Sequence, residues 1–407
     1  MPTDPQKYLA FMKQHADEFL AVRHTIHQNP ELGFEEFGTS ELVAKKLASW
    51  GYEVERGIGD TGVVGRLQRG DGSRSIGLRA DMDALPILED TGLPYASNKP
   101  GVMHACGHDG HTTMLLGAAK YLAEEGDFSG TVNLIFQPAE EGRGGALKML
   151  EHGLFEKYPC DAVFGMHNLP GYPQGKLMFR DGPTMASADK VVITLTGVAG
   201  HGAMPHQSVD PIVAAASLVM ALQTIVSRNV DPQSMAIVTV GMLNAGQANN
   251  IIPDRAVMEL TVRTLDRDVR NQVEKRIRAI TAAQAESFGC EAHIVYDHAF
   301  AVLVNTPDET ALARSLGREL LGEQGIDPAF VAQTASEDFS YMLEKRPGNY
   351  CYIGNGVGQE HGSCNVHNPG YDFNDANLPI GSAYFALLAE RFLAGQMGSK
   401  SSEAVPA

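Results

Sequence analysis

The chain has 407 residues, of which 43% are hydrophobic and 20% are charged. These values are typical of a globular protein, and the length favours two domains over one. The formal net charge is −17, and no stretch rich in lysine and arginine offsets it, which argues against nucleic acid as a partner.

The five cysteines are odd in number and widely spaced, which does not fit a disulfide framework and indicates a reducing compartment. Residues 1–20 lack the basic segment followed by an apolar segment that marks a secretory signal. No run approaches the roughly 18 apolar residues that span a bilayer. We therefore expect a cytoplasmic protein that does not bind a membrane.

Helices and strands alternate in the first part of the chain. An amphipathic helix is predicted over 38–51 and a strand over 62–67. A further helix is predicted over 110–125, with Asp109 as its N-cap. Three short apolar runs are typical of strands buried on both faces of a largely parallel sheet: 75–80, 131–136 and 161–166.

The pattern changes near residue 186, where a strand is followed by an apolar helix with Asp210 as its N-cap and Pro211 at its first position. Two strands, a helix that begins after Asp266 and a final strand follow. This β-α-β-β-α-β order is that of the split ferredoxin-like unit. The predicted strands are 190–197, 234–243, 255–264 and 291–296, and the helices are 211–228 and 267–288.

After about residue 300 the chain returns to alternating helices and strands, with a strand over 349–354 and a closing helix over 379–395. One domain is therefore predicted to be inserted into another. The expected fold is an α/β domain with a central, mostly parallel sheet flanked by helices, and an inserted ferredoxin-like α+β domain. The first comprises residues 1–185 and 300–407, the second residues 186–299. The tail 398–407 is predicted to be disordered.

Side chains of the types that bind metals follow four of the predicted strands or lie in the loop 103–111. Ligands bind beyond the carboxyl ends of the strands in open α/β sheets. Each residue alone has an ordinary explanation, such as a solvated acidic pair, a turn-capping aspartate or a buried histidine. Their convergence on one edge of a sheet instead predicts a metal site. The residues are Asp81, Asp83, Cys106, His108, His111, Glu140, Glu141, His167 and His367.

Five of these side chains exceed what one tetrahedral site takes: Cys106, His108, Glu141, His167 and His367. Two ions that share a bridging ligand and a water would use all five. The Cys106 thiolate could be that bridge. Glu140 is adjacent to a ligand and is not needed as one, so we predict that it is the general base that takes the proton of the water.

Eight motifs, in chain order, resemble those of one amidohydrolase family: RADMDALP, MHACGHDGH, QPAEEG, GMHN, GHGAMPH, NNIIPD, ASEDFSYM and NVHNPGYDFND. This family includes hippurate hydrolases, bacterial N-acyl-amino acid deacylases and plant auxin-conjugate hydrolases. The chain is more distantly similar to aminoacylases, succinyl-diaminopimelate desuccinylase and two-domain carboxypeptidases. The resemblance covers residues 15–395, and it implies a zinc-exopeptidase-like fold with an inserted lid or dimerisation domain.

The resemblance also implies roles for residues of the metal site. It gives the same five ligands, with Glu140 as the base and Asp83 as the carboxylate that orients a ligand or tunes the site. The distant relatives carry a metal-binding histidine where this chain has Asp81, so the role of Asp81 stays open. His104 and His111 are expected to support the ligands rather than to bind metal.

In the inserted domain, the resemblance implies that His201 donates to the substrate carbonyl as the tetrahedral intermediate forms. Asn250 and Arg263 match positions that hold a substrate carboxylate. A guanidinium suits this task because its planar fork pairs with a carboxylate through two hydrogen bonds. The alternatives are an ordinary loop histidine and a strand arginine in a salt bridge.

These features predict a dinuclear metal-dependent amidohydrolase that cleaves the amide bond of N-acyl-L-amino acids. Zinc or manganese is the expected metal, with cobalt or nickel as alternatives. A carboxypeptidase or dipeptidase of the same two-domain plan would activate water in the same way. A metal-dependent binding protein without activity is the third reading, but it would have no need of Glu140 beside Glu141.

A two-fold homodimer, or a dimer of dimers, is expected through the inserted domain. The ferredoxin-like unit has two strands that could be sheet edges, and exposed edges are usually paired or covered. The helix 211–228 has more apolar surface than one face of a small sheet needs. The resemblance implies the same assembly, in which His201 would lie towards the metal site of the partner.

Overall fold

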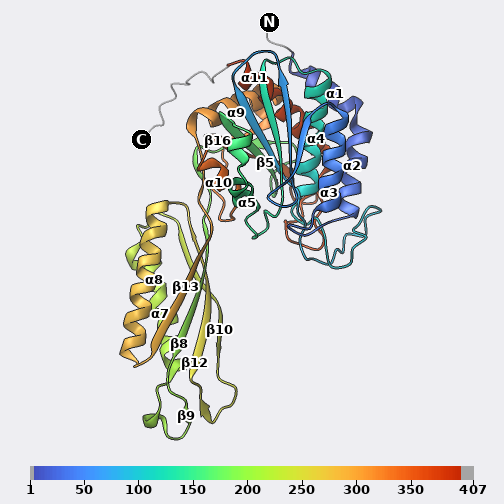
Figure 1. The fold of residues 1–407 in the computed structure, drawn as a ribbon. Helices are drawn as coiled ribbons and strands as arrows, with labels where there is room; N and C mark the ends of the chain where they lie inside the picture. Colours follow the sequence, from blue (N-terminus) through green and yellow to red (C-terminus); the bar gives the residue numbers. More distant parts are fainter. Residues whose placement is uncertain (1–3, 396–407) are drawn as a thin grey trace. The chain divides into compact units, whose positions relative to one another are not determined.

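The computed structural model describes residues 4–395 (Figure 1), so the tail predicted to be disordered lies outside the described residues. The chain divides into two compact units. The first unit comprises the residues up to Gly182, Val304–Val331 and the residues from Tyr341 on. The second unit comprises Pro183–Leu303 and Ala332–Ser340.

An eight-stranded sheet forms the centre of the first unit, in the order β1-β2-β4-β3-β5-β16-β6-β15. Its four middle strands, β4, β3, β5 and β16, are parallel, which confirms the prediction for the first three from their apolar runs. Towards one edge, β2 pairs antiparallel with both β4 and β1. Towards the other edge, β6 pairs antiparallel with β16 and parallel with β15. The bounds are β1 Glu53–Ile58, β2 Gly62–Arg69, β3 Ser75–Asp81, β4 Gly130–Gln137, β5 Ala162–Pro170, β6 Leu177–Met178, β15 Ile326–Asp327 and β16 Gly348–Gly356.

Helices pack against this sheet and bury its apolar side chains. The helix α4 is buried along most of its length, where it packs against α2 and α11. The helices are α1 Gln6–Gln14, α2 Ala16–Gln28, α3 Phe37–Ser49, α4 His108–Glu124, α5 Gly145–Glu151, α6 Leu154–Lys157, α9 Pro307–Leu321 and α11 Leu378–Leu393, with the short α10 at Phe339–Leu343.

The start of α4 differs from the prediction. The helix begins at His108, and Gly107 precedes it with a left-handed φ of 93°. Asp109 lies inside the first turn, and its buried carboxylate accepts a hydrogen bond from Arg23 instead of capping the helix. The cap prediction was wrong because a buried cation from α2, distant in sequence, takes this carboxylate.

The second unit is a four-stranded antiparallel sheet in the order β10-β12-β8-β13, with α7 and α8 on the same side of it (Figure 1). Along the chain the order is β8-α7-β10-β12-α8-β13, which is the ferredoxin-like arrangement. Both predicted N-caps are confirmed, since Asp210 accepts from the Ile212 amide and Asp266 accepts from two amides of its helix. The bounds are β8 Ala188–Thr196, α7 Pro211–Thr224, β10 Ala236–Ala245, β12 Arg255–Thr264, α8 Arg267–Ser287 and β13 Glu291–Phe300.

One helical segment of the second unit, Pro211–Asn229, is long and apolar enough to cross a membrane by length and composition alone. The segment is not a continuous apolar run, because Gln223, Thr224, Ser227 and Arg228 interrupt it, so it does not contradict the expectation about runs of roughly 18 apolar residues. One face of the segment packs into the core of the unit through Ala214, Ala215, Leu218 and Leu222. Its other face leaves four large apolar side chains exposed: Ile212, Val213, Met220 and Val226.

Candidate metal centre

The structure brings the five predicted ligands together in the first unit. They form two groups of three, and within each group the potential ligand atoms all lie within 4.8 Å of one another. Cys106 belongs to both groups. The first group is Cys106, His108 and His167, and the second is Cys106, Glu141 and His367. Two neighbouring ions that share one ligand would need this arrangement.

Two of the histidines have their ring orientation set by a partner of Nδ1. The Nδ1 atom of His108 lies 3.1 Å from Oδ1 of Asp83, and Nδ1 of His167 lies 2.5 Å from the backbone oxygen of Asn168. Each acceptor favours a proton on Nδ1, so Nε2 of each ring is the atom left to bind a cation once it carries no proton. Within residues 4–395, Nε2 of His108 is buried and has no hydrogen-bond partner. The donor set therefore fits a metal ion.

The Cys106 sulfur lies 3.4 Å from Nε2 of His167. Burial and the nearby Glu141 raise the pKa of the Cys106 thiol well above its usual value. The thiol therefore keeps its proton unless a cation replaces it, and a divalent ion would do so.

The loop that carries Cys106 depends on a glycine. Gly107 has φ 93°, and a Cβ at this position would lie 2.3 Å from Nδ2 of Asn168 and 2.4 Å from the Tyr371 hydroxyl. Asn168 also donates to the Cys106 carbonyl at 2.7 Å. A side chain at position 107 would therefore displace the loop and the cysteine with it.

Asp83 connects the two halves of the site. Its Oδ1 accepts from His108, and its Oδ2 accepts from the Glu141 amide at 2.9 Å. Nε2 of His367 lies 3.1 Å from Oε1 of Glu141. Glu140 is mostly buried and forms a further group with His108 and Glu141, so the carboxylates of both glutamates reach the centre.

Asp81 and His111 are buried next to the predicted ligands and contact each other. Nδ1 of His111 donates to Asp81 at 2.6 Å, and its Nε2 accepts from the Asn168 amide at 3.0 Å. Both ring nitrogens are thus used, which leaves no lone pair for a metal. Asp81 also pairs with Arg79 at 2.6 Å. The sequence leaves the role of Asp81 open, and its contacts make it the buried charge partner of Arg79 and His111.

Within residues 4–395, neither ring nitrogen of the buried His104 has a hydrogen-bond partner, and burial lowers the pKa of His104 to about 4. Its ring is therefore neutral in the core. Sequence reasoning missed Asn168, which binds the Cys106 loop, His111 and the Tyr371 hydroxyl. Its place directly after His167 in the motif GMHN was the available signal.

A buried arginine also escaped the sequence analysis. Arg23 on α2 donates to Asp109 at 2.9 Å and forms an ion pair with Asp372. Asp109 follows the ligand His108 directly, and Asp372 lies in the same loop as His367. Arg23 therefore links, through its two carboxylate partners, the two segments that carry the predicted ligands His108 and His367.

In the second unit, His201 and Asn250 lie on neighbouring segments. The strand β9 Gly200–His201 pairs with β11 Ile251–Ile252, and the Gly202 amide donates to the Asn250 carbonyl at 2.8 Å. Nδ1 of the exposed His201 accepts from the Ala203 amide at 3.0 Å. The neutral ring therefore carries its proton on Nε2, where it can donate to a ligand.

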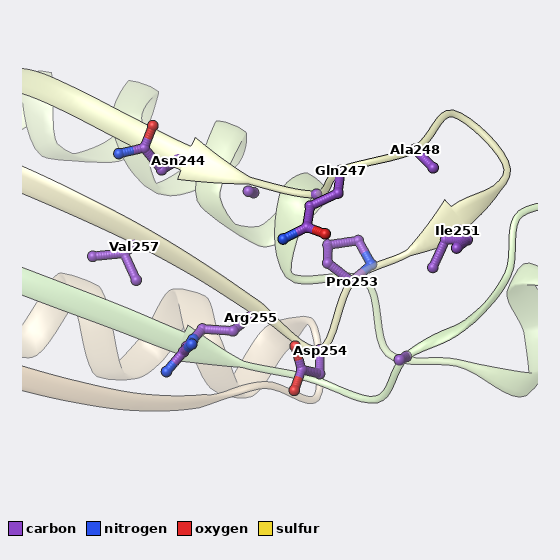
Figure 2. Close-up of a pocket in the computed structure, with 11 residues that line it drawn as sticks. Asn244, Gln247, Ala248, Ile251, Pro253, Asp254, Arg255 and Val257 are labelled. Carbon is purple, nitrogen blue, oxygen red and sulfur yellow. The ribbon is translucent and has the colours of Figure 1, made fainter.

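A cavity of about 520 Å³ adjoins this pair of strands (Figure 2). Ile251, the partner of His201 in the ladder, lines it, and Asn244, Gln247 and Arg255 supply polar atoms around it. The cavity lies between the end of β10 and the start of β12, so it belongs to the same end of the second unit as His201.

Arg263 lies near the opposite end of β12. Eight residues separate it from Arg255, which corresponds to about 26 Å at the usual rise of a strand. Figure 1 shows β9 beyond the other end of the same sheet. Arg263 donates to the Ser336 hydroxyl at 2.9 Å. The second unit of one chain therefore does not bring Arg263 and Asn250 together.

Comparison with known proteins identifies the family of this chain. Residues 77–391 match the model of Peptidase family M20/M25/M40. The chain is 48% identical to a hippurate hydrolase of Campylobacter jejuni, over 92% of this chain and 97% of that protein. It is 41% identical to an N-acetyl-L-cysteine deacetylase of Bacillus subtilis, over 95% and 91% of the two chains.

A solved structure shares the fold as well. A dinuclear metal-binding peptidase of the M20 family from Bacillus subtilis aligns with a TM-score of 0.82 and 34% identity. The alignment covers 94% of this chain and 99% of that one. The matched family model spans most of the chain and includes all five residues of the two ligand groups. The chain therefore belongs to Peptidase family M20/M25/M40.

Proposed function

We propose that this protein is a dinuclear metal-dependent amidohydrolase that cleaves N-acyl-L-amino acids into a carboxylic acid and a free amino acid. The observation that carries the proposal is the pair of ligand groups that share Cys106. The relatives support the substrate class, because hippurate and N-acetyl-L-cysteine are both N-acyl amino acids. The five cysteines are free, which supports a cytoplasmic location.

One divalent ion would be held by Cys106, His108 and His167, and a second by Cys106, Glu141 and His367. When bound, such ions polarise an amide carbonyl and lower the pKa of a water. Thiolate and imidazole ligands favour zinc, whereas carboxylates also suit manganese, so these two metals are the first to test.

The residues of the chain then move the protons. Glu140 takes a proton from the attacking water and delivers it to the departing nitrogen, so no net proton is left on the enzyme. Asp83 keeps the His108 ring turned and the Glu141 backbone in place through its two oxygens. The Nε2 proton of His201 is available to the carbonyl oxygen as negative charge develops there.

We expect Asn250 and Arg263 to bind the substrate carboxylate. The distance between these two residues determines whether both can do so within one subunit. A single carboxylate cannot contact two residues at opposite ends of a strand about 26 Å long. Both residues can contact the same substrate only if they come from different subunits. The separation therefore supports a homodimer in which His201 and Asn250 of one subunit complete the metal site of its partner.

The second unit offers surfaces for such a dimer. The helix segment Pro211–Asn229 leaves four large apolar side chains exposed, and β10 is an edge strand with exposed residues along its second half. Edge strands and apolar patches of this kind are usually covered in stable proteins.

A metal analysis of the purified protein combined with a substrate panel tests the proposed function. We expect two ions per chain and turnover of hippurate or N-acetyl amino acids, with loss of activity on chelation. Turnover of dipeptides alone would assign the protein to the carboxypeptidases or dipeptidases of the family. Two bound ions without turnover of any amide would indicate a binding protein.

A further inference from the structure

The residue before Glu140 has an unusual backbone. Ala139 has a φ of 53°, and it is one of four non-glycine residues between positions 4 and 395 with a positive φ. A left-handed backbone is unfavourable for a residue with a Cβ, and alanine has no polar side chain that could compensate. Ala139 is also fully buried. Surrounding groups must therefore hold this conformation.

Glu36 supplies one such contact. Its side chain is fully buried at the start of α3, and Oε1 accepts from the Ala139 amide at 2.8 Å. Oε2 accepts from the Thr61 hydroxyl, which orients the carboxyl group. Burial raises the pKa of Glu36 to about 7. The proposed reaction gives this buried acid no role of its own.

The other side of the turn is enclosed by backbone. A Cβ on Gly33 would lie 3.0 Å from both Cα and Cβ of Ala139, and Arg143 donates to the Gly33 carbonyl at 2.8 Å. The Gly145 amide donates to the Ala139 carbonyl at 3.0 Å, and a Cβ on Gly145 would lie 1.7 Å from the Pro138 oxygen. The turn 138–145 is therefore closed internally at Gly145 and packed closely against Gly33, so Ala139 cannot shift towards Gly33.

We propose that Glu36 is a positioning residue for the general base, because it holds Ala139 in the left-handed conformation that aims the Glu140 side chain. The proposal rests on the proposed function, in which Glu140 is the base. If Ala139 relaxed to an ordinary negative φ, the chain would rotate by more than 100° about that bond. The Glu140 carboxylate would then leave its place beside His108 and Glu141.

Variants that change the length of the side chain at position 36 test this proposal better than a variant that removes the side chain. Glu36→Asp keeps the charge but shortens the side chain by one methylene, about 1.5 Å, so the carboxylate no longer reaches the Ala139 amide. Glu36→Gln removes the charge but keeps the length, and its amide can accept from Ala139 and donate to Thr61. Glu35→Asp makes the same shortening on the exposed neighbouring residue and is the matched control.

We expect Glu36→Asp to lower kcat by at least about tenfold, since small displacements of a catalytic group have effects of this size. KM and bound metal should stay near the wild-type values. Glu36→Gln and Glu35→Asp should retain most of kcat. Adding Ala139→Gly to Glu36→Asp should restore most of the lost kcat, because glycine adopts a positive φ without the Cβ penalty.

Three results would overturn the proposal: an unchanged kcat in Glu36→Asp, a larger loss in Glu36→Gln than in Glu36→Asp, or no rescue by Ala139→Gly in a folded, metal-loaded double variant. Melting temperatures of all variants identify a loss that comes from unfolding. The assay uses whichever amide the wild-type protein hydrolyses in the panel. Failure of the proposed substrate class would therefore show in the wild type, separately from the role of Glu36.

Discussion

Co-expression of two inactive variants tests whether His201 acts in the site of the partner subunit. One chain carries Glu140→Ala and the other carries His201→Ala, and each is inactive as a homodimer. In a mixed dimer, the His201→Ala chain supplies an intact metal site and the Glu140→Ala chain supplies an intact imidazole. One of the two sites in the mixed dimer is then complete.

The size of the recovery follows from the pairing. Random assembly makes about half of the dimers mixed, and each mixed dimer has one of two sites intact, so roughly a quarter of the wild-type activity should return. Different affinity tags on the two chains allow the mixed dimer to be purified, and its activity per dimer should be about half that of the wild type. Hydrolysis of hippurate at saturating metal is the assay.

The structure supplies a matched control for this experiment. His201 and Asn250 lie at the same end of the second unit, whereas Arg263 lies at the other end of β12. His201→Ala should therefore complement Arg263→Ala but should not complement Asn250→Ala, because in the latter pair every site lacks one residue. If verified mixed dimers of the Glu140 and His201 variants show no recovery, His201 acts within its own chain and the reasoning is refuted.

Glu140→Ala should abolish turnover and keep both metal ions, whereas Glu141→Ala should lose metal, as measured by metal analysis after gel filtration; the reverse result would exchange the two roles. Iodoacetamide should label Cys106 in the metal-free protein only at strongly alkaline pH, because burial raises the pKa of its thiol. At the same pH it should spare Cys106 in the metal-loaded protein, while the partly exposed Cys364 labels in both. Equal labelling of Cys106 would contradict its role as a thiolate ligand. Arg263→Ala should lower kcat/KM on substrates with a free carboxylate, by an amount that corresponds to a loss of about 2–4 kcal/mol in transition-state stabilisation. It should have little effect on the corresponding amides, and an equal loss on both would make Arg263 a structural residue.

The sequence alone determined the features that depend on neighbouring residues. Short apolar runs predicted the parallel strands β3, β4 and β5, because strands buried on both faces need continuous apolar side chains. Asp210 and Asp266 capped the predicted helices because an N-cap bonds to amides only two or three residues away. The candidate ligands were found from local patterns too. Glu141, His167 and His367 follow predicted strands, and Cys106 and His108 lie together in one short loop.

Tertiary structure decided what those side chains do. Asp109 has the sequence position of a cap, but Arg23, 86 residues away, takes its carboxylate into the core. His111 was expected to support the ligands, and only the folded chain shows how, since Asp81 and the Asn168 amide occupy both of its nitrogens.

The conformation of Ala139 shows the same limit most clearly. Nothing in QPAEEG indicates a left-handed alanine, and its φ depends on a carboxylate from α3, 103 residues away, and on a glycine that lets the backbone approach. Sequence patterns report spacing along the chain, whereas hydrogen bonds and close packing depend on which distant segments meet in the folded chain.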